Sequence, residues 1–374
     1  MTISRSYRKR ESGIEALKIL AIILIIISHV AKTALEGPGV EQKIEFLNGT
    51  DNLQYLLLII FYHFGRWGNI IFFTCSAWFL LSSDRFDKRK WLFMLVEIWT
   101  ISVLILAVSW YFVKDEIAVR DIVKSLFPTY FNNNWYLTCY LLFYPLHPVL
   151  NGVIRRMNKT ALFRFSAALF VLYLLLPFVK GSFFGSKIIY WISMYFVIAY
   201  CKTYLSDYTD NVKLNAAVMV LSFLCFIGAI ILMNALCRRF SFLAGQILHW
   251  NGDNNPILFI LSFSMFQVVR HIKFKNTAIN YVSGLSMLVY VFHENIILRT
   301  YMRPQIINEI HTRFGYDHIA AWVVCAALLI FAASVIVTAI YRETIQKYVK
   351  AASDRLYGWL RRLWLAAERR MVRT

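Results

Sequence analysis

Ten apolar runs, each long enough to cross a bilayer, constrain the fold of this 374-residue chain more than any other feature. A helix needs about 20 mostly apolar residues to cross a hydrocarbon core about 30 Å thick. The runs lie at 14–35, 54–82, 91–113, 135–153, 163–180, 186–206, 213–236, 255–272, 279–302 and 319–341. They predict an all-α integral membrane protein with about ten transmembrane helices. In the long second run, GRWG at 65–68 is a point where an interfacial segment could be divided from a true span.

Composition excludes the ordinary soluble classes. Hydrophobic residues make up 59% of the chain and charged residues 16%, far from the average soluble domain. The net charge of +19 would suggest a nucleic-acid partner in a soluble protein, but here the basic residues lie between apolar runs and at the chain ends. We therefore expect a lipid bilayer and no nucleic acid. The six cysteines have no CxxC or metal-like spacing, so we expect neither a disulfide framework nor a metal site.

The distribution of Lys and Arg predicts the orientation. With the N-terminus inside, the cytoplasmic segments hold 22 of these residues and the external loops hold 8. Positive residues concentrate in cytoplasmic loops, so both termini are expected in the cytoplasm and the protein in the plasma (inner) membrane. We expect one ten-helix domain over 1–341 and a basic tail over 342–374. That tail interleaves Trp and Leu with Arg, which suits either an amphipathic helix on the inner leaflet or a solvated basic tail.

Three ionisable residues lie on one face of the first run. Lys18 and His29 are eleven residues apart, which is almost three helical turns and about 16 Å along the axis. Glu15 lies one turn before Lys18 and can pair with it near the cytoplasmic end. Ionisable groups inside a span are costly, so this face is expected to meet protein or water rather than lipid.

The ninth run contains a polar break at His293, Glu294 and Asn295. Both the first and the ninth runs are expected to start in the cytoplasm. His29 and His293 then lie at similar depths, roughly 21 to 23 Å from the inner side. Two histidines at one depth could line one cavity.

A basic loop follows the second run. Ser76 lies near the inner end of that run, and Arg85, Lys88, Arg89 and Lys90 follow it within fifteen residues. These cations could hold a phosphorylated ligand, with Arg as the bidentate member. The alternative is that they serve only the positive-inside rule.

Four further residues are candidates for substrate contact. Trp135 and Tyr136 open the fourth run, where aromatic residues also occur simply as an interfacial belt. His63 and Arg66 lie within the second run, and an embedded Arg needs a partner that the sequence does not name.

Four segments in order resemble the membrane-bound acyltransferase 3 family. GIEALKILAIILIIISHV is similar to the family's first helix, in which an acidic residue, Arg or Lys, and then His recur at this spacing. IFFTCSAWFLL is similar to its FF-x-x-S-G-F-L-L segment, NNWYLTCYLLFYPL to its W-F-L…Y segment, and SMLVYVFHENI to its S-x-x-x-Y-x-x-H segment. The chain departs from the family pattern at three positions. Lys18 stands where Arg is commoner, and Ala77 stands where Gly is usual. The loop after the second run has Arg85-x-x-Lys88 in place of the family's R-x-x-R, so Lys88 replaces the second arginine.

The resemblance implies O-acylation of carbohydrate. Members of this family modify surface polysaccharides and related glycans with an acyl group, usually acetyl from cytoplasmic acetyl-CoA. Here His29 would be the catalytic base or form a transient acyl-histidine, with Glu15, Lys18 and His293 in the catalytic set. Lys18, Ser76, Arg85, Lys88 and Arg89 would bind the acyl-CoA donor. The carbohydrate acceptor would contact His63, Arg66, Trp135, Tyr136, Glu294 and Asn295.

Two other classes of membrane protein fit a polar cavity. A transporter or flippase of lipid-linked saccharides would often show inverted repeats and Gly- or Pro-broken helices, and neither pattern is present. In a non-catalytic sensor or scaffold, the polar residues would only pair helices. The sequence indicates neither the acceptor, nor the acyl group, nor an oligomeric state.

Overall fold

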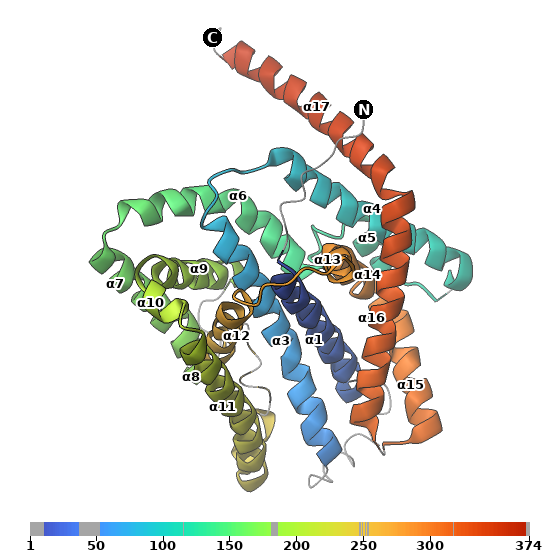
Figure 1. The fold of residues 1–374 in the computed structure, drawn as a ribbon. Helices are drawn as coiled ribbons and strands as arrows, with labels where there is room; N and C mark the ends of the chain where they lie inside the picture. Colours follow the sequence, from blue (N-terminus) through green and yellow to red (C-terminus); the bar gives the residue numbers. More distant parts are fainter. Residues whose placement is uncertain are drawn as a thin grey trace. The chain divides into compact units, whose positions relative to one another are not determined.

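A computed structural model of the chain describes residues 11–36, 53–114, 116–180, 186–246, 254–316 and 318–371, together with residues 248, 250 and 252. These residues form helices and connecting turns without any strand (Figure 1). The longer helices are α1 (Ser12–Glu36), α3 (Leu53–Leu80), α4 (Lys88–Val113), α6 (Trp135–Arg156), α9 (Lys187–Tyr204), α11 (Val212–Arg239), α16 (Ile319–Thr344) and α17 (Gln346–Met371). The shorter ones are α5 (Val119–Leu126), α7 (Lys159–Phe170), η1 (Val171–Leu175), α8 (Leu176–Lys180), α10 (Ser206–Thr209), η2 (Ser241–Gln246), α12 (Pro256–Val269), α13 (Thr277–Gly284), α14 (Ser286–His293), η3 (Leu298–Met302) and α15 (Arg303–Phe314).

Seven helical stretches of the described chain are long and apolar enough to cross a membrane. They are Ser12–Leu35, Leu53–Leu80, Lys88–Phe112, Trp135–Arg156, Lys159–Val179, Val212–Arg239 and Ile319–Thr344. Each coincides with one of the predicted runs, which confirms an all-helical, multi-pass membrane protein. The orientation of the termini stays a prediction.

The other three predicted runs do not form long apolar helices. α9 has only 18 residues and carries a lysine near each end, at Lys187 and Lys202. α12 has 14 residues, fewer than a straight crossing requires. The expectation of one helix over 279–302 is wrong, because the chain there divides into α13, α14 and the π-helical turn η3.

α3 is continuous through Gly65 and Gly68, so the expected division at GRWG is wrong. These glycines face α1 instead of breaking the helix. A Cβ atom on Gly68 would lie 2.4 Å from the Ala21 carbonyl oxygen, and one on Gly65 would lie 2.6 Å from Ser28 Oγ. Small residues let helices inside a membrane approach closely. The Ser28 hydroxyl also donates a 2.6 Å hydrogen bond to the Tyr62 carbonyl.

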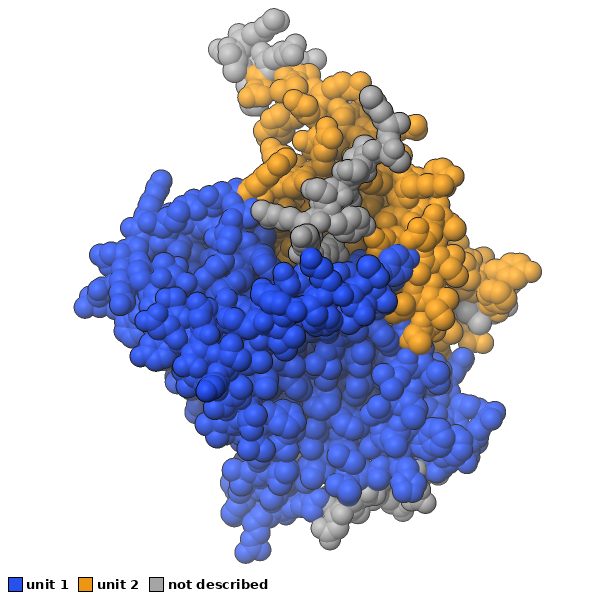
Figure 2. Space-filling model, in the orientation of Figure 1, with its two compact units in different colours: residues 1–84, 147–286, 303–331 blue, residues 85–146, 287–302, 332–374 orange. Residues whose placement is uncertain are grey.

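The chain forms two compact units that interleave along the sequence (Figure 2). Unit 1 comprises residues 1–84, 147–286 and 303–331, and unit 2 comprises residues 85–146, 287–302 and 332–374. The domain boundary expected at residue 341 stays a prediction.

Unit 1 is built around α1. This helix packs along α3 and also contacts α12, α13 and α15. Its inward side chains are almost fully buried, among them Ile22, Ile25 and Ile26.

Unit 2 includes α4, α14 and α17. The Trp91 Nε1–H donates a 2.8 Å hydrogen bond to the Leu141 carbonyl of α6. Gln346 Nε2 donates to Glu97 Oε1 at 2.6 Å, and the Arg89 guanidinium lies 5.3 Å from the centre of the Tyr357 ring. α17 therefore runs antiparallel to the first half of α4. Residues 346–371 of the predicted basic tail form this helix, and its place on the inner leaflet stays a prediction.

Replacing Gly68 with Leu tests the α1–α3 packing. A leucine side chain has no room against Ala21, so we expect Gly68→Leu to lower the free energy of unfolding by about 1 to 3 kcal/mol. Gly228 of α11 is the matched control, because a Cβ atom there meets nothing within 4 Å. Thermal unfolding in detergent should show a lower midpoint for Gly68→Leu and an unchanged midpoint for Gly228→Leu; equal midpoints would contradict the packing.

Candidate active site

The Glu15 carboxylate, in the first turns of α1, has partners on two helices. Lys18 Nζ lies 3.2 Å from Glu15 Oε1, which confirms the predicted ion pair. The Ser283 hydroxyl of α13 donates a hydrogen bond to the other carboxylate oxygen. Glu15 is only 7% exposed, so these partners take the place of water around its carboxylate. The carboxylate therefore fixes the Lys18 ammonium group at one place on α1.

The start of α1 is anchored to α13 by a second set of contacts. The Ser12 hydroxyl donates to Asn280 Oδ1 at 3.0 Å and accepts from the Asn276 backbone N–H at 2.8 Å. Gly13 lies so close to the end of α12 that a Cβ atom would be 2.8 Å from the Ile272 carbonyl oxygen. These contacts hold the turn that carries Glu15 and Lys18.

His29 is half-buried, whereas its neighbours Ser28 and Val30 are buried. The helix at this point is held against α3 by the Ser28 hydroxyl, as described above. Thr33 Oγ1 donates to the His29 carbonyl at 3.0 Å. The imidazole is thus partly open on a backbone that is fixed.

Lys18 and His29 share one face of α1, as predicted. The helix is continuous from Ser12 to Glu36, so eleven residues at 1.5 Å each separate them by about 16 Å. Buried isoleucines occupy the turns between them. A cation and an imidazole therefore lie on one rigid element at a fixed separation.

The predicted residues of α3 differ in their surroundings. His63 is 1% exposed; its Nδ1 lies 2.8 Å from the Ile59 carbonyl oxygen, and its ring packs edge-on against Phe226. This placement favours a packing role. Arg66 and Ser76 are both half-buried. Ser76 lies on the last two turns of α3.

Two further cations lie at the same end of α3. Lys202 Nζ and the Arg270 guanidinium lie 4.9 and 5.0 Å from the centre of the Trp78 ring. Lys202 donates to the Trp78 carbonyl and to Ser82 Oγ at 2.5 and 2.6 Å, and Arg270 pairs with Asp210. The sequence did not predict this cluster, because Lys202 and Arg270 are far from Trp78 along the chain and meet it only when α9, α12 and α3 pack together.

In unit 2, His293 and Glu294 form a cluster with an arginine. His293 Nδ1 lies 2.8 Å from the Val289 carbonyl oxygen, which is the geometry of an Nδ1–H donor. His293 Nε2 lies 4.0 Å from Glu294 Oε2, and Arg299 Nη1 lies 3.1 Å from Glu294 Oε1. Arg299 Nη1 also donates to the Asn133 carbonyl at 3.2 Å. The Glu294 carboxylate therefore lies between an imidazole and a guanidinium group.

Asn295 explains why the ninth run is broken here. Its Oδ1 accepts a 2.9 Å hydrogen bond from the Ile297 backbone N–H, and its Nδ2 lies 3.4 Å from Ser102 Oγ. The side chain thus caps the new turn after α14 ends at His293. The structure gives Asn295 a role in shaping the backbone.

Aromatic rings connect the fourth run to His293. The Tyr136 and Tyr290 ring centres are 6.0 Å apart, and those of Tyr290 and His293 are 5.6 Å apart. Tyr136 is buried, and Trp135 is half-buried with its ring 5.8 Å from Tyr136. The structure therefore brings Tyr136, His293 and Glu294 together within unit 2.

Arg85, Lys88 and Arg89 are all exposed at the start of α4. The Asp87 side chain caps this helix, accepting from the Arg89 and Lys90 backbone N–H groups at 3.1 and 3.0 Å. In unit 1, Asp84 pairs with Arg155 at 2.6 Å, and this contact lowers the pKa of the Asp84 carboxyl. The three cations remain accessible to a ligand.

Sequence reasoning missed three polar residues of these clusters. Ser283 and Asn133 gave no signal, since their partners are far away in the sequence. Arg299 gave one, because it is an arginine inside an apolar run and lies five residues after Glu294. An embedded cation near a carboxylate would have predicted the pair.

Comparison with known proteins identifies the family. The profile of the family described as "Acyltransferase domain" (Acyl_transf_3) matches residues 11–341. Searches of curated proteins and of solved structures found no significant match. The matched range includes α1, α3, α6 and α14, which carry the clusters described above. The chain therefore belongs to the acyltransferase 3 family of multi-pass membrane acyltransferases.

Proposed function

We propose that the chain is an O-acyltransferase of the plasma (inner) membrane. It transfers an acyl group, most simply acetyl, from cytoplasmic acyl-CoA to a hydroxyl of a cell-surface or lipid-linked carbohydrate. One observation carries the proposal: a fixed cation and a half-buried imidazole share one face of α1 in a chain of this family.

His29 acts as the general base in this mechanism. A sugar hydroxyl is a poor nucleophile, and a neutral imidazole near pH 7 is suited to take its proton. As the proton moves to His29, the hydroxyl oxygen attacks the thioester carbonyl and a C–O bond forms. The C–S bond then breaks, and the proton passes from His29 to the CoA sulfur. In the variant mechanism, a transient acyl-histidine forms first.

The cations bind the donor phosphates. Lys18 supplies a point charge whose position the Glu15 carboxylate and the Ser283 hydroxyl determine. Arg85, Lys88 and Arg89 supply further accessible charge, and Ser76 supplies a hydroxyl. With the phosphates at Lys18, the pantetheine arm of CoA would have to span the about 16 Å that separate Lys18 from His29.

The acceptor side consists of the cluster around His293. Trp135 and Tyr136 offer aromatic surface to a sugar ring, and Glu294 offers acceptors for sugar hydroxyl groups. Arg299 supports this role by holding one oxygen of the Glu294 carboxylate. Arg66 is a further candidate, whereas His63 contributes through packing because it is buried.

Removal of the base tests the proposed reaction. In cells that lack the native gene, wild-type protein should restore O-acetylation of surface glycans, measured by NMR or mass spectrometry. His29→Ala should lower it to the level of the deletion strain, because the variant lacks the proposed base. His271→Ala is the matched control, since His271 is exposed at the end of α12. Full acetylation by His29→Ala at normal abundance would refute the mechanism.

Charge at position 18 tests donor binding. A hydrogen bond to a charged group contributes about 1.5 to 3 kcal/mol, so Lys18→Gln should raise the KM for acetyl-CoA by about 10- to 100-fold. Lys18→Arg keeps the charge and should stay within a few-fold of wild type. Steady-state kinetics in nanodiscs provide the measurement. Equal KM values for Lys18→Gln and Lys18→Arg would show that this ammonium group does not bind the donor.

A further inference from the structure

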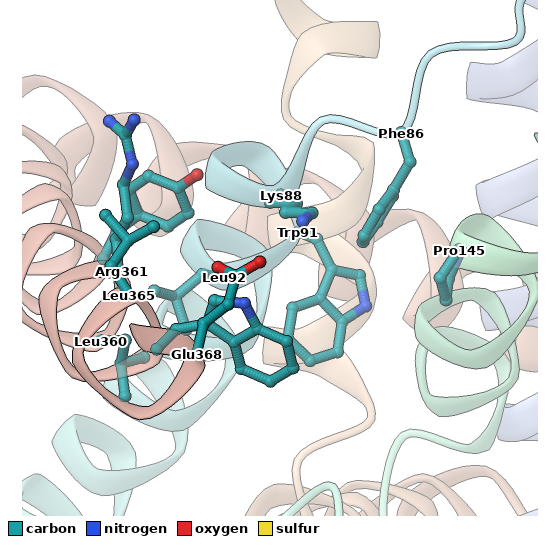
Figure 3. A pocket seen from close by; sticks show the side chains of 11 residues that line it. Phe86, Lys88, Trp91, Leu92, Pro145, Leu360, Arg361, Leu365 and Glu368 are labelled. Atoms are coloured by element: carbon teal, nitrogen blue, oxygen red, sulfur yellow. The ribbon is translucent and has the colours of Figure 1, made fainter. Parts of the chain in front are cut away.

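A groove of about 630 Å³ lies in unit 2, between the start of α4 and the last turns of α17. Figure 3 shows Phe86 and Trp91 on one side of it and Leu360 and Arg361 of α17 on another. Its volume is within the range of about 300 to 1,000 Å³ that is usual for small-molecule sites. The mechanism above does not use it.

Aromatic rings make up much of the groove wall. Phe86, Trp91, Tyr357 and Trp364 all line it. The Phe86 and Trp91 ring centres are 6.5 Å apart, and Trp91 is fixed by its hydrogen bond to α6. Trp364 is 71% exposed although it lines a groove. A flat ligand could cover this indole face.

The charged groups of the groove are few and of both signs. Lys88 and Arg361 contribute cations, and Glu368 contributes one carboxylate. Arg89, one residue after Lys88, lies against Tyr357 of α17. The groove is thus continuous with the cationic start of α4, which the proposed function assigns to the donor phosphates.

We propose that this groove binds the nucleotide end of the CoA donor, an inference that rests on the proposed function. The adenine base stacks on the aromatic wall formed with Trp364. Lys88 and Arg361 bind the ribose 3′-phosphate of this nucleotide end, and the Glu368 carboxylate accepts a hydrogen bond from the adenine amino group. The family profile ends at residue 341, so α17 would add a recognition element outside the matched range.

Phospholipid is the other occupant that an apolar groove with cations could take. A phosphate of either ligand would suit Lys88 and Arg361. Four aromatic rings and a carboxylate suit a planar base with amino donors better than an acyl chain, for which such rings offer no specific partner. The experiment below separates the two ligands.

Donors with and without the nucleotide provide the test. Stacking on one aromatic side chain contributes enough that Trp364→Ala should raise the KM for acetyl-CoA by about 5- to 100-fold. It should leave kcat unchanged, and it should leave the KM for acetyl-pantetheine unchanged, because that donor has no nucleotide. Trp359→Ala is the matched control, since Trp359 is an exposed tryptophan of the same helix that does not line the groove.

Direct binding separates this proposal from the proposed function. Adenosine 3′,5′-bisphosphate should bind the protein in nanodiscs, and Trp364→Ala but not Trp359→Ala should weaken binding by a similar factor. That result would stand even if no acyl transfer were found. Absence of binding, or equal KM changes for both donors, would overturn the proposal. Trp364→Ala could instead lower activity equally with acetyl-CoA and acetyl-pantetheine, by an amount that varies with the anionic lipid content of the nanodiscs. That result would overturn the proposal and indicate a lipid site.

Discussion

The close contact between α1 and α3 is the interaction on which the rest of unit 1 depends. Gly65 and Gly68 allow the two backbones to approach, and the Ser28 hydroxyl joins them at the level of His29. Inside a bilayer, apolar side chains gain little by leaving lipid, so close packing and hydrogen bonds determine where a helix lies. α1 therefore has one position, and the ionisable groups along its face have one spacing.

Two buried carboxylates, Glu15 and Glu294, are each paired with a cation. Glu15 has an ammonium and a hydroxyl partner, and Glu294 has a guanidinium partner. A lone charge in this environment would be costly, and each of these carboxylates has a cation within 3.2 Å. Elsewhere in unit 2, the cations Lys88 and Arg361 border the aromatic groove between α4 and α17.

Helices and contacts between residues close in the sequence could be predicted. Contacts between residues far apart in the sequence could not. Apolar length predicted ten spans, of which seven form long apolar helices, and helical spacing predicted the Glu15–Lys18 pair. The three adjacent polar residues at 293–295 were noticed, but the end of α14 at His293 was not predicted from them. GRWG was misjudged because glycine breaks isolated helices, whereas here a neighbouring helix occupies the space that the missing side chains leave. Ser283 could not be predicted, since only the fold brings α13 to the start of α1.

A structure with a non-transferable acetyl-CoA analogue, determined by electron cryomicroscopy in nanodiscs, would test the central claim most directly. That claim is that one face of α1 holds the donor's phosphates at Lys18 and its acyl end at His29. We predict phosphate oxygens within hydrogen-bonding distance of Lys18 Nζ and the acyl-bearing end of the analogue beside the His29 imidazole. A bound analogue whose acyl end lies away from His29, with the phosphates clear of Lys18, would contradict the account.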